Sequence, residues 1–348
     1  MFLKSFILIA FLAIGYGSCE KVSFEGFKIV RIFPTDKSHL ELIGQLQHNP
    51  DFDVLNSARI LETPILVVLS PEALVKYSPI FSTNKVEFRV IDNNIQRKFD
   101  LQDKSMKKNK RDAKNIVGKF SRYSEINNYI DEVVAASPNI ASSYVAGTTH
   151  ENRIIKALVF KTATSNRGIF IDCGLHAREW IAVSSCIWMI DSMQKAFENG
   201  DASMQAILSK YEIHIIPLAN PDGYEYSHTT NRMWRKNRRP NSGSSCIGTD
   251  LNRNFGYKWL TGGSSTNPCS DSYAGPSGDS ELETKAIEKA ILNKNGYWDA
   301  YLTIHTYGQY WLTSWSYTTD LPADYDDLKL AVDIGAAAIK NLFGNKKL

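Results

Sequence analysis

Hydrophobic and polar residues follow different patterns in the N-terminal and C-terminal regions of this chain. Between residues 22 and 101, short apolar runs predict strands at 27–33, 64–70 and 86–92. Apolar residues at helical spacing between these runs predict helices at 38–47 and 70–79. The N-terminal region is therefore predicted to be a small α+β unit.

The C-terminal region, from about residue 114, alternates strand-like and helix-like segments. Near-continuous apolar runs predict strands at 155–161, 168–175, 211–220 and 298–308. Helical spacing predicts helices at 123–137, where Ser124 is the expected N-cap, and at 179–197, 279–295 and 324–343. Because strands that are apolar on both faces are covered by helices on both faces, we expect an α/β fold with a largely parallel or mixed sheet.

A polar, lysine-rich stretch at 101–115 separates the two regions and shows no hydrophobic periodicity. Such a stretch is most often a solvated linker. Here it carries basic residues after which a trypsin-like protease can cut an exposed, mobile backbone, namely Lys107, Lys108, Lys110 and Arg111. We therefore predict a basic cleavage linker at 106–113.

The first 19 residues have the pattern of a cleaved secretory signal. A lysine near the start is followed by an apolar stretch from Phe6 to Ile14 and then by small residues. The alternative is a membrane anchor, but the apolar stretch is shorter than the roughly 20 residues that a spanning helix needs. No second such stretch occurs in the sequence. The mature protein is therefore predicted to be secreted, with no membrane partner.

Composition and charge narrow the possible functions. Hydrophobic residues make up 43% and charged residues 22%, as in ordinary globular domains, and a net charge of +3 gives no indication of nucleic-acid binding. Besides Cys19, which would leave with the signal, the chain has four cysteines that an oxidising compartment allows to pair. The simplest of the three possible pairings closes short loops, Cys173 to Cys186 and Cys246 to Cys269. Free buried thiols are the alternative.

His176 and Glu179 lie three positions apart, directly after the predicted strand at 168–175. Ligands gather at the carboxyl ends of strands in such sheets, and imidazole and carboxylate are both good zinc ligands. His305 ends another predicted strand and supplies a third ligand, which leaves a position for water at a catalytic zinc. The alternative for each residue alone is a hydrogen-bonded structural histidine or a surface cluster.

Two segments between these ligands are rich in arginine. The first is predicted to be a turn-rich loop and carries Arg232, Arg235, Arg238 and Arg239; the second places Asn252 beside Arg253. The planar fork of arginine suits a carboxylate, so a cationic pocket near a metal would recognise an anionic substrate end. A solvated basic surface is the alternative, and it is our expectation for Arg238 and Arg239.

Five motifs occur in a specific order: HAREW (176–180), NPDGY (220–224), RMWRK (232–236), DLNRNF (250–255) and IHTYG (304–308). In this order they resemble the zinc carboxypeptidases of the pancreatic and insect-gut A/B type. The resemblance implies a mixed central sheet flanked by helices at 114–348, preceded by a small α+β activation domain at 20–105. It also implies a monomeric zymogen, secreted into a digestive lumen and activated by a trypsin-like protease, that removes amino acids from peptide and protein C-termini.

The resemblance implies roles for single residues. One zinc ion would be bound by His176, Glu179 and His305, and would activate a water molecule and polarise the scissile carbonyl. Arg235 would stabilise the oxyanion of the tetrahedral intermediate, and Asp250 would orient the first histidine ligand. Substrate would be bound by Arg178, Asn252, Arg253 and Tyr307. The family also has disulfides like Cys246–Cys269 and, in B-type members, Cys173–Cys186.

The sequence departs from the family pattern at its C-terminal end. Family members continue beyond the helix at 324–343 with elements that bring a mobile tyrosine, the glutamate general base and the floor of the specificity pocket, whereas this chain stops at Leu348. Glu281 and Glu283 are expected to face solvent and cannot replace that base, so we expect little activity from the chain as given. The alternative function is an inactive zinc-binding form of the same fold. Residues 312–322 resemble B-type members, which remove C-terminal Lys or Arg.

Overall fold

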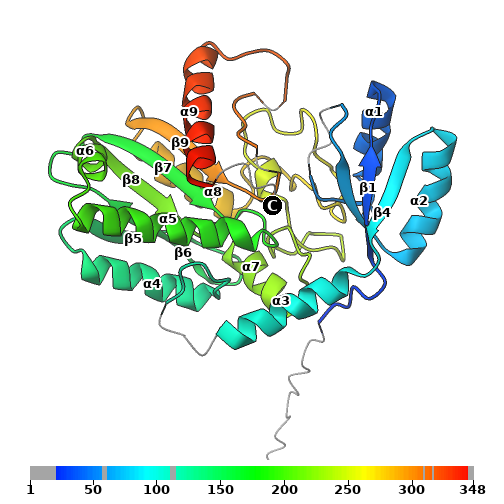
Figure 1. Cartoon of the computed structure of the whole chain (residues 1–348), viewed down its shortest axis with the longest axis horizontal. Helices are drawn as coiled ribbons and strands as arrows, with labels where there is room; N and C mark the ends of the chain where they lie inside the picture. The colour runs from blue at the N-terminus through cyan, green and yellow to red at the C-terminus, as the bar shows by residue number, and fades with distance from the viewer. Residues whose placement is uncertain (1–20, 57–60, 110–114, 309, 316, 344–348) are drawn as a thin grey trace, which may run out of the picture.

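The computed structural model describes residues 21–56, 61–109, 115–308, 310–315 and 317–343. The predicted signal at 1–19 and residues 110–113 of the predicted cleavage linker lie outside this part. Figure 1 shows an N-terminal domain beside a larger C-terminal domain, with a long helix leading from one to the other. Within the described ranges, no helix is long and apolar enough to cross a membrane.

The N-terminal domain is an antiparallel sheet packed against two helices. Its strands are β1 (Lys28–Phe33), β2 (Asp53–Val54), β3 (Ile65–Leu69) and β4 (Glu87–Asp92), in the order β2-β3-β1-β4. Helices α1 (Lys37–Leu46) and α2 (Pro71–Thr83) follow Asp36 and Ser70, whose side chains cap them. The core contains Val30, Ile32, Val67, Tyr77 and Phe81. The three predicted strands and two predicted helices are confirmed, and the short β2 is an addition.

A continuous helix, α3 (Ile95–Asn109), occupies the first part of the stretch that was predicted to be a polar linker. The prediction of a linker was therefore wrong for residues 101–109. The segment contains no glycine or proline, and its unbranched Lys, Gln and Met side chains favour a helix without a wide apolar stripe. Figure 1 shows α3 leaving the N-terminal domain and reaching the C-terminal one, where Met106 packs against the larger core.

The C-terminal domain contains, among its described residues, a five-stranded mixed sheet in the order β5-β6-β8-β7-β9. The strands are β5 (Ala141–Thr148), β6 (Ile154–Phe160), β7 (Arg167–Cys173), β8 (Tyr211–Ile216) and β9 (Trp298–Ile304). β7 pairs in parallel with both β8 and β9, whereas β6 is antiparallel to its two neighbours. The predicted α/β fold with a mixed sheet is therefore confirmed.

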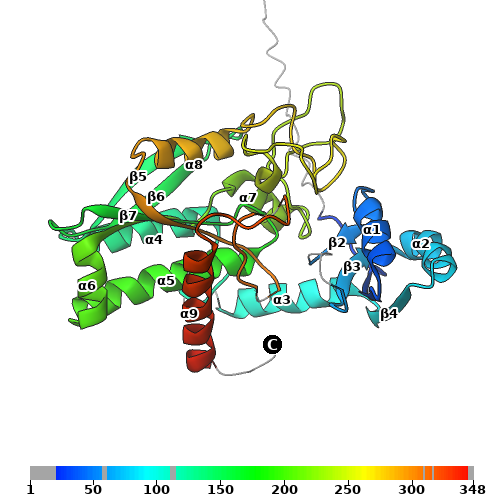
Figure 2. The ribbon, with the colours of Figure 1, turned by 90° about the horizontal axis from the view of Figure 1, so that it is seen from above.

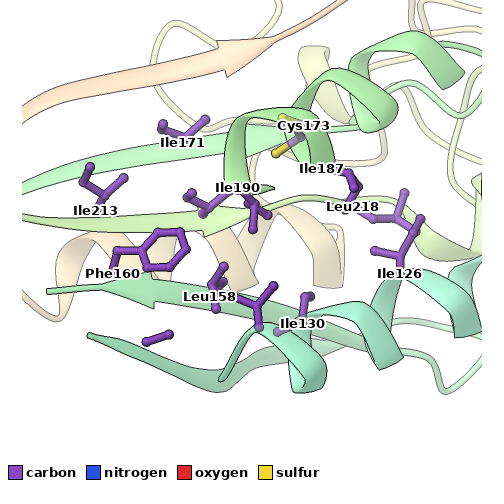
Figure 3. Close-up of a cluster of buried hydrophobic side chains, with 14 of the residues drawn as sticks. Ile126, Ile130, Leu158, Phe160, Ile171, Cys173, Ile187, Ile190, Ile213 and Leu218 are labelled. Carbon is purple, nitrogen blue, oxygen red and sulfur yellow. The ribbon is translucent and has the colours of Figure 1, made fainter. Parts of the chain in front are cut away.

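Helices cover both faces of this sheet (Figure 2). One face packs against α4 (Tyr123–Ala136), α5 (Trp180–Glu198) and α6 (Ala202–Lys210), and the other against α8 (Leu282–Leu292). The strands alternate between the two cores: Ile171 and Cys173 face α5, as Figure 3 shows, whereas Phe170 belongs to the core beneath α8. A last helix, α9, spans Tyr325–Phe343.

Strand β5 and helix α6 were not predicted. Two further details differ from prediction. Residues 221–229, predicted as part of a turn-rich loop, form helix α7 (Pro221–Thr229), because Asn220 accepts a hydrogen bond from the amide of Gly223 and Pro221 suits the first turn. Helix α4 begins after Arg122, not Ser124. There the amide of Arg122 donates to the Glu125 carboxylate at 2.6 Å, which satisfies the start of the helix.

The cysteines pair only in part as expected. Cys246 and Cys269 form a disulfide, but Cys173 and Cys186 are both free and buried, so the second predicted bridge is not present. Burial raises the pKa of the Cys173 thiol, and the hydrogen-bonded thiol of Cys186 raises it further. The Cys173 thiol therefore remains neutral in the core between β7 and α5, where Cys186 is also buried.

Candidate active site

The candidate site lies where β7 and β9 end. These strands are parallel neighbours, with Cys173 opposite Ile304, so the residues that follow them meet at one edge of the sheet. After β7 the chain turns at Gly174, whose φ is +73° and whose position would bring a Cβ atom within 2.8 Å of Val183. A glycine is therefore required here for conformation and for space. The turn delivers His176 and Glu179 beside His305.

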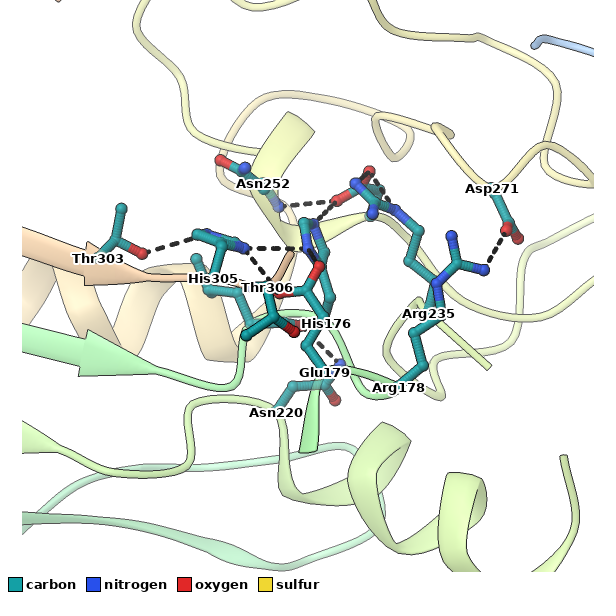
Figure 4. A network of polar contacts seen from close by, with 12 residues as sticks. His176, Arg178, Glu179, Asn220, Arg235, Asn252, Asp271, Thr303, His305 and Thr306 are labelled. Carbon is teal, nitrogen blue, oxygen red and sulfur yellow. Dashed lines mark hydrogen bonds and ion pairs between the residues drawn. The ribbon is translucent and has the colours of Figure 1, made fainter. Parts of the chain in front are cut away.

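Three side chains converge on one point (Figure 4). His176 Nδ1 lies 2.7 Å from Glu179 Oε1, and His305 Nδ1 lies 3.1 Å from both His176 Nδ1 and Glu179 Oε2. His176 and Glu179 are buried and His305 is half-buried. Two imidazole nitrogens that face each other across this distance, with a carboxylate beside them, form a donor set that suits zinc.

Asp250 supports this cluster from behind. Its Oδ1 lies 3.2 Å from His176 Nε2, and its Oδ2 accepts two hydrogen bonds from Arg235, at 2.9 and 3.1 Å. Burial acts to raise the pKa of Asp250, but Arg235 and His176 outweigh it and hold the pKa well below its usual range. Burial likewise acts to raise the pKa of Glu179, and His176 and His305 bring it below its ordinary value. Both carboxylates are therefore ionised.

A cavity of about 220 Å³ opens beside the cluster. Its lining includes most of the cationic and aromatic residues predicted for the site, namely Arg178, Arg232, Arg235 and Tyr307, together with Glu179. The ring of Trp180 contributes as well, with the Arg232 guanidinium over it at 3.7 Å. The cavity therefore combines a metal-binding cluster with fixed positive charge.

Other predicted residues lie apart from this cavity. Asn252 and Arg253 do not line it, and the Arg253 guanidinium donates to the backbone oxygens of Gly263 and Asn252 at 2.7 and 2.8 Å. Arg238 stacks on Tyr226 at 3.6 Å and Arg239 pairs with Glu281, so neither is the freely solvated charge that was expected.

The N-terminal domain contributes residues to the site that the sequence did not single out. Leu55 and Gln102 line the cavity, and Asp53 accepts a hydrogen bond from Arg178 at 2.8 Å. No signal in the sequence pointed to these residues, because their proximity depends on how the two domains dock.

The prediction that Glu281 and Glu283 face solvent was wrong. Both side chains are buried, and Asn237 Nδ2 donates a hydrogen bond to Glu281 at 2.8 Å and to Glu283 at 3.0 Å. Asn237 also accepts from the amide of Thr249, so this buried group braces the loop that carries Arg235 against the one that carries Asp250.

A mixed α/β sheet with two histidines, a glutamate and arginines beyond the ends of its parallel strands defines a metal-dependent hydrolase with a cationic substrate pocket. The chain belongs to the zinc carboxypeptidase family: residues 126–347 match the family model "Zinc carboxypeptidase", and residues 30–102 match "Carboxypeptidase activation peptide". The family uses one catalytic zinc ion, and the N-terminal domain is the propeptide domain of a zymogen.

Relatives span nearly the whole chain. Carboxypeptidase B of Rattus norvegicus is 32% identical over 98% of this chain and 82% of its own length, and carboxypeptidase A2 of Mus musculus is 30% identical over 95% and 80%. The crystal structure of carboxypeptidase A from Helicoverpa armigera matches with a TM-score of 0.84 at 25% identity, covering 92% of this chain and 79% of that one. The fold is therefore that of carboxypeptidase A.

Proposed function

We propose that this chain is a secreted procarboxypeptidase whose zinc is held by His176, Glu179 and His305. The observation that carries the proposal is the convergence of these three side chains next to a cavity that Arg235 lines and to which the N-terminal domain contributes Leu55 and Gln102. Peptide and protein C-termini are the substrates, because a free α-carboxylate is the anionic group that an arginine-lined cavity next to a metal would recognise.

Each residue of the site has a chemical task. When bound, zinc polarises the scissile carbonyl and lowers the pKa of water. Arg235 is fixed through Nε and Nη2 on Asp250, and it presents a preorganised cation to the negative charge that develops on the carbonyl oxygen. Arg178 and Tyr307 line the cavity and contact the substrate there. Asn252 and Arg253, which do not line this cavity, hold the terminal carboxylate, as the family resemblance implies.

The domains follow the zymogen architecture. Residues 1–19 form the signal, 20–105 the activation domain and 114–348 the catalytic domain, and a trypsin-like protease cuts the basic segment at 106–113. Two observations support this division: Lys107 is exposed near the end of α3, and Gln102 on the same helix lines the cavity. The activation domain thus blocks the groove until it is released. We further propose that the chain acts as a monomer.

The finer specificity we propose is B-type, removal of C-terminal Lys or Arg. Support comes from the resemblance of residues 312–322 to B-type members and from the 32% identity with a carboxypeptidase B.

A second candidate function is a zinc-binding form with little turnover. The observation in its favour is that Glu179 is the one carboxylate among the described cavity-lining residues, and it belongs to the metal cluster, while Asp250 is held by Arg235 and His176. General acid–base catalysis contributes about 10²–10⁴-fold, so a chain without a free base would lose that factor.

One experiment tests the proposal and separates the candidates. The purified chain is loaded with zinc, treated with trypsin and assayed on peptides that end in Lys, Arg, Leu or Phe, beside its His305→Ala variant. Zinc binding with turnover supports the enzyme, and preference for Lys and Arg supports B-type specificity. Zinc binding without turnover supports the second candidate, whereas stoichiometric zinc retained by His305→Ala after dialysis against a mild chelator rejects the site.

A further inference from the structure

We propose that Asp172 and Thr303 are positioning residues for His305, and that they fix which of its ring nitrogens faces the metal. This inference rests on the proposed zinc site. Neither residue stands out in the sequence, because the two belong to strands that are about 130 positions apart and were predicted only as apolar runs.

The two strands place the residues side by side. β7 and β9 pair in parallel with Asp172 opposite Thr303, and the Thr303 hydroxyl donates to Asp172 Oδ1 at 2.9 Å. His305 comes two positions after Thr303, on the same side of the chain, and its Nε2 lies 3.2 Å from the Thr303 hydroxyl oxygen. Figure 4 shows this contact between Thr303 and His305 at the end of the strand.

Proton counting gives this chain of contacts a direction. A threonine hydroxyl has one proton, and it is committed to Asp172. The hydroxyl oxygen must then accept a hydrogen bond, so His305 Nε2 carries the ring proton. His305 Nδ1 is left with a free lone pair, and this is the atom that lies 3.1 Å from His176 Nδ1 and Glu179 Oε2. The tautomer that can bind a metal at Nδ1 is therefore selected.

The hydrogen bonds from His305 through Thr303 to Asp172 form a relay. Asp172 is suited to anchor this relay because water cannot reach its side chain. It is fully buried, and its second oxygen accepts a hydrogen bond from the Tyr301 hydroxyl at 2.5 Å. Both oxygens are thus occupied by hydroxyl donors from β9. The two histidines of the cluster are oriented in different ways: His176 meets the carboxylate of Asp250 directly, whereas His305 meets a carboxylate through a hydroxyl.

The competing explanation is that Asp172 and Thr303 only hold β9 to β7. Two substitutions separate the explanations. Thr303→Val removes the hydroxyl at an exposed strand position and keeps the side-chain shape and strand preference, and Thr303→Ser keeps the hydroxyl. Tyr301→Phe is the matched control, since it removes a hydrogen bond to the same carboxylate but leaves the contact of Thr303 with His305 intact.

The experiment measures the zinc dissociation constant of the full chain by competition with a chelator, for these variants and for His305→Ala. We expect Thr303→Val to weaken zinc binding by about 10–100-fold, the range measured when such outer contacts of a metal ligand are removed. The zinc dissociation constants of Thr303→Ser and Tyr301→Phe are expected to stay within about twofold of that of the unaltered chain, because both variants keep the contact of residue 303 with His305.

A second measurement does not depend on any variant folding. Nitrogen chemical shifts of the metal-free chain should show His305 protonated at Nε2. A proton on Nδ1, or zinc affinity in Thr303→Val equal to that of the unaltered chain while His305→Ala has lost it, overturns the relay alone. Unchanged affinity in His305→Ala instead overturns the zinc site on which the relay rests.

Discussion

Arg178, the residue directly before the metal-cluster residue Glu179, donates a hydrogen bond to Asp53 of the activation domain at 2.8 Å. The same guanidinium nitrogen also contacts the backbone oxygen of Met233 at 3.1 Å and Asp271 at 3.3 Å. Arg178 is nearly buried in this arrangement, with 9% of its side chain exposed, so the charge of Asp53 is opposed by a cation that water reaches poorly. The carboxylate of Asp53 in the activation domain therefore occupies the guanidinium group of Arg178, to which we assign a role in substrate binding.

We expect Asp53→Asn to loosen the docking of the two domains. Removing one charge from a poorly hydrated pair at an interface costs about 2 kcal/mol or more, which is roughly thirtyfold in an equilibrium. The amide of Val22 reports on docking, because it donates to Thr230 across the interface at 2.8 Å. Its hydrogen exchange should be roughly thirtyfold faster in Asp53→Asn.

The control for this prediction is Glu87→Gln. Glu87 and Arg89 form an ion pair in the same domain, but both side chains are more than half exposed, so its loss should change docking little. Equal exchange of the Val22 amide in all three proteins would show that Asp53 contributes nothing to docking.

Glu283 should make the stability of the protein depend on pH. Burial raises the pKa of Glu283 to about 7 in the fold, and Asp222 and Glu281 add to the effect, against an ordinary value of 4.5. Below pH 4.5 the carboxyl is protonated in both states. As pH rises toward 7 only the unfolded chain ionises, so the free energy of unfolding should fall, by about 3 kcal/mol in total.

Glu283→Gln should remove this loss, since the amide stays neutral at every pH. Denaturant unfolding at pH 5 and pH 8 measures the effect. At pH 8 the free energy of unfolding of the variant should rise relative to that of the unaltered chain. Glu132→Gln, an exposed position on α4, serves as the control and should leave the difference between the two pH values as it is. An identical pH dependence in Glu283→Gln would mean that another group is responsible.

Gly174→Ala should weaken zinc binding as well as the fold. A Cβ at this position meets Val183 at 2.8 Å in a backbone of φ +73°, so the turn that delivers His176 has to shift. Gly200 has a similar φ of +76° with nothing within 4 Å of its Cβ position, so Gly200→Ala carries only the conformational penalty, about 1 kcal/mol. We expect zinc affinity to fall in Gly174→Ala but not in Gly200→Ala. An equal fall in both variants would show that the close contact with Val183 does not matter.

The cysteines should divide into two classes under alkylation. Cys173 and Cys186 are buried thiols, so they should be protected in the native protein and labelled after unfolding without reductant. Cys246 and Cys269 should be labelled only after reduction, and their double replacement by serine should cost about 3 kcal/mol for a loop of this length, 23 residues. Mass spectrometry of the labelled peptides distinguishes the four residues. Cys173 and Cys186 found unlabelled until reduction would show that they are bridged in solution.

The sequence allowed the metal cluster to be predicted because its three residues follow directly from strand ends, and parallel strands end at a common edge. Residues whose position depends on tertiary contacts were not predictable in the same way. Glu283 sits on a helix whose pattern left it on the polar face, and its burial depends on Asn237, which lies 46 positions away. Helix α7 was missed because proline and glycine favour turns, and the Asn220 cap that overrides this is a single side chain.

Helix α3 shows why cutting the basic segment and opening the groove are separate events. The cut would break the covalent connection within the segment 106–113 but would leave Gln102 bonded to Arg232 at 2.9 Å, Val22 bonded to Thr230 and Asp53 bonded to Arg178. A nicked but still assembled complex is then an obligatory species, and binding of a peptide C-terminus at the site should appear after a lag that follows the disappearance of intact chain. Because the two pieces are held together by reversible contacts, dilution should shorten the lag and concentration should lengthen it.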